Sequence, residues 1–309
     1  MKNSKIIKII KNIWVLVVIV GAGYYVYSNR RDFYSYLSNI ETWRLLSSMA
    51  LLLGARILLY FQSQFSLSCL GETIPFRKLF SILSLTQLGK YLPGGIWHIV
   101  GQFGMYRTNK LSNLNSGKAM LLENIWIVFS ALYFGLAFLF LSGSFPNGKY
   151  DILPIKPEVY IPILIAAILV IWIYSIYLSL RFLAPTNPNQ LIFSLKIFVF
   201  QFINWLLFGL SFVILFEGLS VDHSDVLLGI GGFAIGWVGG YLAFFAPGGV
   251  GIRELILAFL LSPFLTVANV STVAIVHRLV WTIAEIITGL AGWALEKTQL
   301  SDPKPSDVL

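Results

Sequence analysis

Long apolar runs divide the chain into segments of membrane-spanning length. A helix of about 20 mostly apolar residues crosses the hydrocarbon core of a bilayer, so each such run predicts a transmembrane helix. The continuous runs cover 7–27, 43–68, 119–142, 159–182, 191–216 and 272–295. Shorter stretches separate them, among them the linker 28–42 and the short turn at 263–271.

Two other apolar stretches are interrupted by the same triplet, Pro-Gly-Gly, at 93–95 and at 247–249. Proline removes a backbone donor and glycine permits a sharp bend. The flanking segments are 79–92 and 96–107 at the first break, and 226–245 and 250–265 at the second. Freed backbone groups are tolerated at membrane depth only inside protein or beside water, so we expect broken helices or re-entrant hairpins here. The residues that form these breaks are Pro93, Gly94, Gly95, Pro247, Gly248, Gly249 and Gly251.

A shift of 154 residues superimposes the two triplets and predicts an internal repeat. The same shift places Gly135-Leu136-Ala137 on Gly289-Leu290-Ala291, and Glu123-Asn124 on His277-Arg278. The two repeat units cover about 43–142 and 191–295, and 159–182 forms a linker helix between them. A single crossing between the units inverts the second unit relative to the first, as in many transporters.

The sequence therefore predicts an all-α polytopic membrane protein. We expect about seven full spanning helices and two broken or re-entrant Pro-Gly-Gly hairpins, in a single membrane domain over 1–309 with a polar tail at 296–309. Composition agrees: 57% of residues are hydrophobic and 12% are charged, against about 25% charged in soluble domains. Mean hydropathy is +0.78. The single cysteine, Cys69, excludes a disulfide within the chain.

Loop charges predict how the chain crosses the membrane. Loops 69–78 and 107–118 are rich in lysine and arginine, whereas loop 217–225 is acidic, so the first two should be cytoplasmic and the third external. Both termini are then cytoplasmic, in the cytoplasmic membrane. The net charge of +8 belongs to loops and helix ends, so nucleic acid is not an expected partner. The lysine-rich start is typical of a signal peptide as well, but no clean cleavage site follows.

Several ionisable residues lie inside the apolar segments. A charge at the bilayer centre costs at least ~2.5–3.5 kcal/mol on insertion scales, so these groups should face one another or a wet cavity. They are Arg56, Lys90, Glu123, Arg253, Glu254, Arg278 and Glu285, with His98 and His277. In the last helix, Arg278, Trp281, Thr282, Glu285 and Gly289 recur on one face at helical spacing.

Some of these residues are candidates for binding an anionic head group. Arginine binds phosphate through its bidentate fork, and we expect Arg253 and Arg278 to do so, with Lys90 approaching from the other hairpin. The full candidate set is Lys90, His98, Gln102, Arg253, Glu254, Arg278 and Glu285. The alternative is that Arg253–Glu254 and Arg278–Glu285 are structural ion pairs. We expect no catalytic residue, metal or cofactor, because neither paired carboxylates nor a histidine–acid cluster has suitable spacing.

The segments GKYLPGGIWHIVGQFGMYR and APGGVGIRE, followed by HRLVWTIAEIITGLAG, resemble the transmembrane domain of the lysylphosphatidylglycerol synthase (flippase-like) family. The resemblance covers roughly 45–295 and implies translocation of a lipid or a lipid-linked precursor in a bacterial or archaeal membrane. The chain ends at Leu309, without the soluble aminoacyl-transferase domain of the full-length synthase. The resemblance therefore concerns the flippase-like part alone.

These observations together predict a flippase-like protein that moves an anionic phospholipid or a lipid-linked glycan precursor across the cytoplasmic membrane. Its expected partner is a membrane lipid, with a second copy or envelope-glycan enzymes as further candidates. An ion-coupled transporter or an accessory protein of envelope polysaccharide biosynthesis is the alternative, and a membrane-embedded lipid-modifying transferase is less favoured. Proton coupling through Glu254 or Glu285 and passive scrambling both remain open.

Overall fold

The computed structural model describes residues 27, 30–91, 96–143, 157–182, 190–216, 223–243, 249, 251–262 and 265–301. Within these ranges the regular structure is helical throughout and contains no strand. The elements are α2 (Arg30–Asn39), α3 (Thr42–Cys69), α4 (Phe76–Gln87), the 3-10 helix η1 (Leu88–Tyr91), α5 (Trp97–Thr108), α6 (Asn113–Leu141), α7 (Pro157–Phe182), α8 (Gln190–Val213), α9 (His223–Leu242), α10 (Ile252–Leu261) and α11 (Val267–Ser301).

Six of the described helices are long and apolar enough to cross a membrane. They are Thr42–Cys69, Asn113–Leu141, Ile161–Ser179, Leu195–Val213, Asp225–Leu242 and Val267–Thr298. The chain is therefore an all-α, multi-pass membrane protein, as the sequence predicts. The first predicted helix, 7–27, lies outside the described residues except for Tyr27.

Two predicted boundaries are wrong. The linker 28–42 contains the helix α2, and its Tyr36 hydroxyl donates to the Leu215 carbonyl at 2.5 Å, which attaches α2 to the end of α8. The last helix extends beyond 272–295, so part of the 263–271 turn and part of the 296–309 tail are helical. Thr266 accepts from the backbone of Asn269 and caps its first turn.

The two Pro-Gly-Gly breaks separate helices of different lengths. α4 and α5 have 12 residues each and α10 has 10, about half of the ~20 that span a bilayer. α9, in contrast, has 20 residues and is one of the six helices that are long enough to cross. The re-entrant character of both pairs stays a prediction.

Of the break residues, Gly249 and Gly251 are described, whereas Pro93, Gly94, Gly95, Pro247 and Gly248 lie outside the described residues. Gly249 and Gly251 have φ of 69° and 87°, in the region that favours glycine. A β-carbon on Gly249 would also lie 2.6 Å from the backbone of Gly240 in α9. The second break is therefore pressed against α9 and requires glycine at this position.

The helices after the two breaks recur in the same order and at nearly the same spacing as the triplets. α5 and α10 begin at 97 and 252, and α6 and α11 at 113 and 267. Gly135 of α6 and Gly289 of α11 match under the shift of 154 residues, and each packs closely against the segment that precedes the break of the other unit. A β-carbon on Gly135 would meet Ile235 of α9, and one on Gly289 would meet Leu88 of η1. The inverted relation between the halves stays a prediction.

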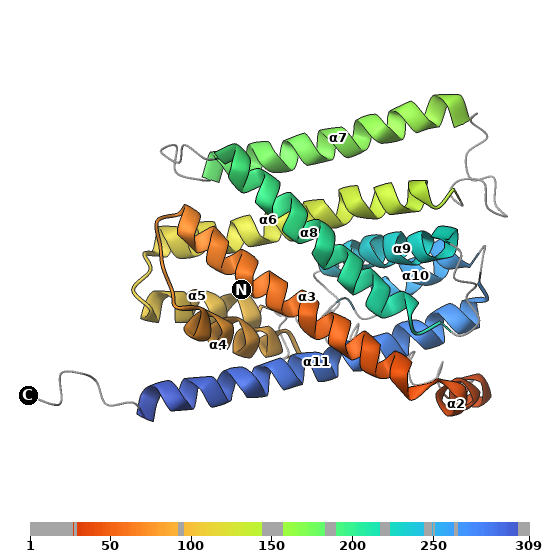
Figure 1. Cartoon of the computed structure of the whole chain (residues 1–309), viewed down its shortest axis with the longest axis horizontal. Coiled ribbons are helices and arrows are strands. Elements are labelled where there is room, and N and C mark those ends of the chain that lie inside the picture. The colour runs from red at the N-terminus through yellow and green to blue at the C-terminus, as the bar shows by residue number, and fades with distance from the viewer. Residues whose placement is uncertain are drawn as a thin grey trace, which may run out of the picture.

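Large aromatic side chains fill the centre of the bundle. Trp205, Phe208 and Phe212 of α8 are almost fully buried, together with Phe233 of α9, and they pack against α3, α6 and α11. The helix α7 lies along one edge of the molecule, next to α6 (Figure 1). Its apolar side chains are largely exposed, which suits contact with lipid.

Candidate functional site

The carboxylate of Glu285 in α11 is the centre of a buried charged cluster. Its side chain is 1% exposed and forms ion pairs with Arg56 of α3 and Lys90 of η1. Trp281 Nε1 donates to it at 2.8 Å and the Tyr91 hydroxyl at 2.5 Å. One carboxylate thus joins α3, η1 and α11.

The indole of Trp281 brings a further cation to this cluster. Its ring centroid lies 5.2 Å from Arg56 Cζ, 5.9 Å from Lys90 Nζ and 5.4 Å from Arg253 Cζ. These distances are within the range of cation–π attraction, which is strongest for tryptophan. The ring also packs on Phe208, with centroids 4.7 Å apart. Trp281 therefore places the cations of α3, η1 and α10 around a single aromatic surface.

Arg253 of α10 is buried, and no carboxylate of the described residues pairs with it. Its side chain is covered, its Cζ lies 4.2 Å from the ring centroid of Phe233, and its terminal nitrogen lies 3.4 Å from His277 Nδ1. Among the described residues, no acidic group lies within ion-pair distance of it. A guanidinium has five N–H donors, and one long hydrogen bond leaves most of them available.

The contact with Arg253 indicates the protonation state and the tautomer of His277. Because arginine can only donate, His277 Nδ1 must accept, so the imidazole is neutral with its proton on Nε2. Nε2 then donates to Ser211 Oγ at 2.9 Å, and that hydroxyl donates to the Phe208 carbonyl at 2.6 Å. His277 therefore adds no positive charge, and it positions Arg253 instead.

Glu254 and Arg278 form the more open side of the cluster. Arg278 Nη1 lies 3.5 Å from Glu254 Oε1, and the two side chains are 21% and 19% exposed. The other carboxylate oxygen of Glu254 accepts from the Gly251 backbone at 2.7 Å and so caps the start of α10. The carboxylate of Glu254 thus binds the N-terminus of α10 and Arg278 at the same time. Both of these groups attract anions.

The structure pairs the charges differently from the predicted ion pairs. Glu254 faces Arg278 in place of Arg253, and Glu285 binds Arg56 and Lys90 in place of Arg278. Adjacent helix residues point in different directions, which separates Arg253 from Glu254. Positions 278 and 285 are two turns apart, about 10 Å along the axis. The predicted stripe on α11 does face η1, where Thr282 contacts Tyr91 and Gly289 contacts Leu88.

The cluster carries excess positive charge. Arg56, Lys90, Arg253 and Arg278 supply four cations, whereas Glu254 and Glu285 supply two carboxylates. Arg56 and Glu285 are buried at its base, and Lys90 and Arg278 are each about one-fifth exposed at its rim. An arrangement with a cationic interior and a partly open rim can accept an anionic group.

Gln102, one of the predicted binding residues, belongs to a second polar centre. Its Nε2 donates to Glu123 Oε2 of α6 at 3.0 Å and to the Tyr106 hydroxyl at 3.1 Å. The Tyr106 hydroxyl donates to Glu123 Oε1 at 3.2 Å. His98 lies in the first turn of α5, where a β-carbon on Gly89 would come within 2.8 Å of its backbone nitrogen.

Three residues of the cluster were not among those predicted from the sequence to bind the head group. Arg56 has no counterpart in the repeat, yet it is the most buried cation bound to Glu285. Tyr91 is uncharged and gives no signal beyond its position next to Lys90. Trp281 lies on the predicted polar stripe of α11, and that position is the signal that could have assigned it to the site.

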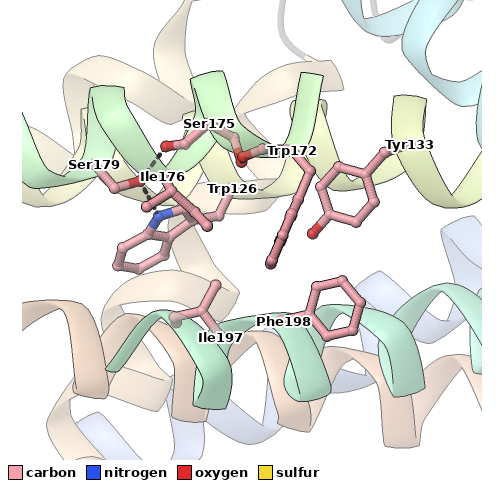
Figure 2. Close-up of a pocket in the computed structure, with 8 residues that line it drawn as sticks. All are labelled: Trp126, Tyr133, Trp172, Ser175, Ile176, Ser179, Ile197 and Phe198. Atoms are coloured by element: carbon pink, nitrogen blue, oxygen red, sulfur yellow. Dashed lines mark hydrogen bonds between the residues drawn. The ribbon is translucent and has the colours of Figure 1, made fainter. Parts of the chain in front are cut away.

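A small hollow, partly open to the outside, lies between α6, α7 and α8 (Figure 2). Its polar groups satisfy one another: Trp126 Nε1 donates to Ser179 Oγ at 2.6 Å, and that hydroxyl donates to the Ser175 carbonyl at 2.7 Å. None of its lining residues belongs to the charged cluster. We therefore attribute the hollow to helix packing.

A comparison with models of protein families gave no match, and no curated protein matched the chain. The resemblance to the flippase-like family stays a prediction. The charged cluster is thus the basis for a functional proposal.

Proposed function

We propose that this protein translocates an anionic lipid, a phospholipid or a lipid-linked glycan precursor, and that the charged cluster binds the phosphate of its head group. The observation that carries the proposal is Arg253, a buried guanidinium with no carboxylate partner among the described residues. A lone buried charge is costly unless something compensates it. An anionic ligand supplies that compensation.

The chemistry of the cluster favours a phosphate. Arginine presents a planar fork that matches phosphate oxygens in two parallel hydrogen bonds. Arg253 has free donors for this purpose, and Arg278 and Lys90 lie at the partly open rim. A lipid is the favoured carrier of that phosphate, because the cluster lies between helices with exposed apolar faces and α11 is long enough to cross the membrane.

Glu254 gives the site a means of releasing its ligand. In the present arrangement its carboxylate binds both Arg278 and the N-terminus of α10. A phosphate that enters would compete with Glu254 for those partners, and its departure would restore them. Glu285 cannot play this part as readily, because two cations and two neutral donors hold it in a buried position.

We place the protein in the cytoplasmic membrane with both termini on the cytoplasmic side. The support is the charge of the loops: 107–118 is basic and 217–225 is acidic. The alternative, an accessory role in envelope polysaccharide assembly, has no specific support in the arrangement of the described residues.

The experiment compares Arg253→Lys with wild type in proteoliposomes that carry fluorescent phosphatidylglycerol or a polyprenyl phosphate. Lysine keeps the charge but loses the fork, so we expect lipid binding to weaken at least tenfold, since hydrogen bonds to charged groups contribute roughly 1.5–3 kcal/mol. Arg107→Lys, an exposed arginine at the end of α5, is the matched control. Glu254→Gln should tighten binding, because it weakens the internal competitor.

If correctly folded Arg253→Lys binds and moves the lipid as wild type does, the head-group site lies elsewhere. The charged cluster would then serve to hold the helices together. Lipid movement that is equally fast in liposomes without protein would contradict translocation itself.

A further inference from the structure

Glu123 is a carboxylate in a membrane-crossing helix, and its hydrogen-bond partners in the described part of the chain are neutral. Its oxygens accept from Gln102 Nε2 at 3.0 Å and from the Tyr106 hydroxyl at 3.2 Å. Gln102 is 7% exposed and Tyr106 is fully buried, so water does not replace these donors freely. Among the described residues, no lysine, arginine or histidine lies within ion-pair distance of Glu123.

We propose that Glu123 is a proton-binding site, and that taking up and releasing this proton couples lipid movement to the proton gradient across the membrane. The coupling rests on the proposed translocation, whereas the proton site itself does not. Protonation adds one proton from the aqueous phase to a carboxylate oxygen and removes one negative charge from the protein interior. No other reactant takes part.

The cost of burying charge supports this assignment. A carboxylate without a cation in an apolar interior is expensive, and it becomes neutral by binding a proton. Two other acids, both in α11, are held by cations: Glu285 by Arg56 and Lys90, and Glu296 by Lys78. The sequence left proton coupling through Glu254 or Glu285 open, but the arrangement of cations favours Glu123.

The neighbours of Glu123 can satisfy both protonation states. Gln102 Nε2 has two N–H groups, and it directs one to Glu123 and one to the Tyr106 hydroxyl. Tyr106 can keep donating to one Glu123 oxygen in both states, while the hydroxyl of Ser63 can donate to the ionised carboxylate or accept from the protonated one, since a hydroxyl does both. The proton can therefore bind and leave while the buried donors of Gln102 and Tyr106 stay paired.

The helices packed against α6 bring neutral groups to this region. Ser63 of α3 faces Glu123, and Tyr60 lies in the same apolar cluster as Tyr106. Just after Glu123 in α6, Tyr241 of α9 donates to Asn124, and Ser179 of α7 accepts from Trp126. On α8, Gln201 accepts from Ser130, and the basic residue of that helix, Lys196, lies over the ring of Phe65.

One face of α3 links the proton site to the anion site. Arg56, Tyr60 and Ser63 follow one another at intervals of about one turn, so they share a face of the helix. Arg56 binds Glu285 at one end of this row, and Ser63 faces Glu123 at the other. The first break adds a second link between the two sites. Lys90 of the anion site lies in η1, just before the break, and Gln102 of the proton site lies in α5, just after it. A change of charge at Glu123 can therefore act on both sides of that break.

The test of the proton site is infrared spectroscopy of the full-length protein in lipid. We expect wild type to show the C=O stretch of a protonated carboxylic acid, which disappears as the pH rises. Glu123→Gln should lack that pH-dependent band. Glu296→Gln, which removes a carboxylate that is ion-paired at the end of α11, is the control and should keep it. A band that survives in Glu123→Gln would overturn the proposal.

The test of coupling is movement of fluorescent phosphatidylglycerol in proteoliposomes with an imposed pH gradient. We expect the gradient to change the rate at least tenfold in wild type and less than twofold in Glu123→Gln, while binding of the lipid at constant pH stays within twofold. Equal gradient responses in the two proteins would overturn the coupling. Should wild type move no lipid, the translocation proposal fails, and the infrared band alone decides whether Glu123 binds a proton.

Discussion

Glu285 and Glu123 are the same residue type in two membrane helices, and the charges around them differ. Glu285 is bound by two cations, an indole N–H and a phenol. Glu123 is bound by an amide and a phenol, with no cation at ion-pair distance among the described residues. The first carboxylate is therefore a fixed counter-charge, whereas the second is free to become neutral. Position in an apolar helix alone does not define the role of an acid.

The largest effect should come from Glu285→Gln, because it leaves the guanidinium of Arg56 buried without its counter-charge. Breaking a buried ion pair in this way costs about 3–5 kcal/mol. Glu296→Gln is the matched control on the same helix, where both partners of the pair are about one-quarter exposed, and it should cost at most about 1 kcal/mol. Unfolding in mixed micelles measures both, and equal losses would show that Glu285 is not a structural counter-charge.

An intermediate effect should come from Arg56→Met. Lys90, Trp281 and Tyr91 still hold Glu285 in this variant, so we expect a loss of about 1–3 kcal/mol in the free energy of unfolding. The double variant with Glu285→Gln should be less destabilised than the two single losses predict, by about 0.5–3 kcal/mol. Strict additivity in the same unfolding assay would mean that the two side chains do not interact.

The smallest effects, and the sharpest comparison, should come from the two tyrosines. Tyr91→Phe removes a hydrogen bond to a charged carboxylate and should cost about 1.5 kcal/mol, the lower end of the range because Tyr91 is 42% exposed. Tyr106→Phe removes a bond to a carboxylate that we expect to be neutral, but it also removes the acceptor of one Gln102 N–H. Measured in a Gln102→Leu background, where that second bond is already absent, it should cost about 1 kcal/mol or less. A larger loss for Tyr106→Phe than for Tyr91→Phe would contradict a neutral Glu123.

Much of the helical framework could be predicted from local pattern. The apolar runs define α3, α6, α7 and α8 to within a few residues, except at the start of α6, where Ser112 caps a first turn that the pattern assigned to a loop. The positive φ of Gly249 and Gly251 follows from the break itself. α2 was missed because a ten-residue helix with two arginines carries no spanning signal, and its attachment to α8 depends on Tyr36.

The candidate site was predictable as a set of buried charges but not as a set of contacts. Lys90, Arg253, Arg278 and Glu285 all carry the same signal, a costly charge in an apolar segment. That signal does not say which acid meets which cation. Arg56 carries the same signal but was not among the predicted binding residues, yet it binds Glu285 directly.

The sequence by itself determined the class of the protein, the positions of its long helices and the need to bury several charges together, because these follow from hydropathy and from the cost of charge in hydrocarbon. Only the tertiary structure decided that Glu285 is paired with cations and that Glu123 has no cation at ion-pair distance in the described part of the chain. The partners of Glu285 come from α3 and η1, which are far from α11 along the chain, and packing alone brings them to it. Glu123 meets α5 instead, whose contribution there is an amide and a phenol.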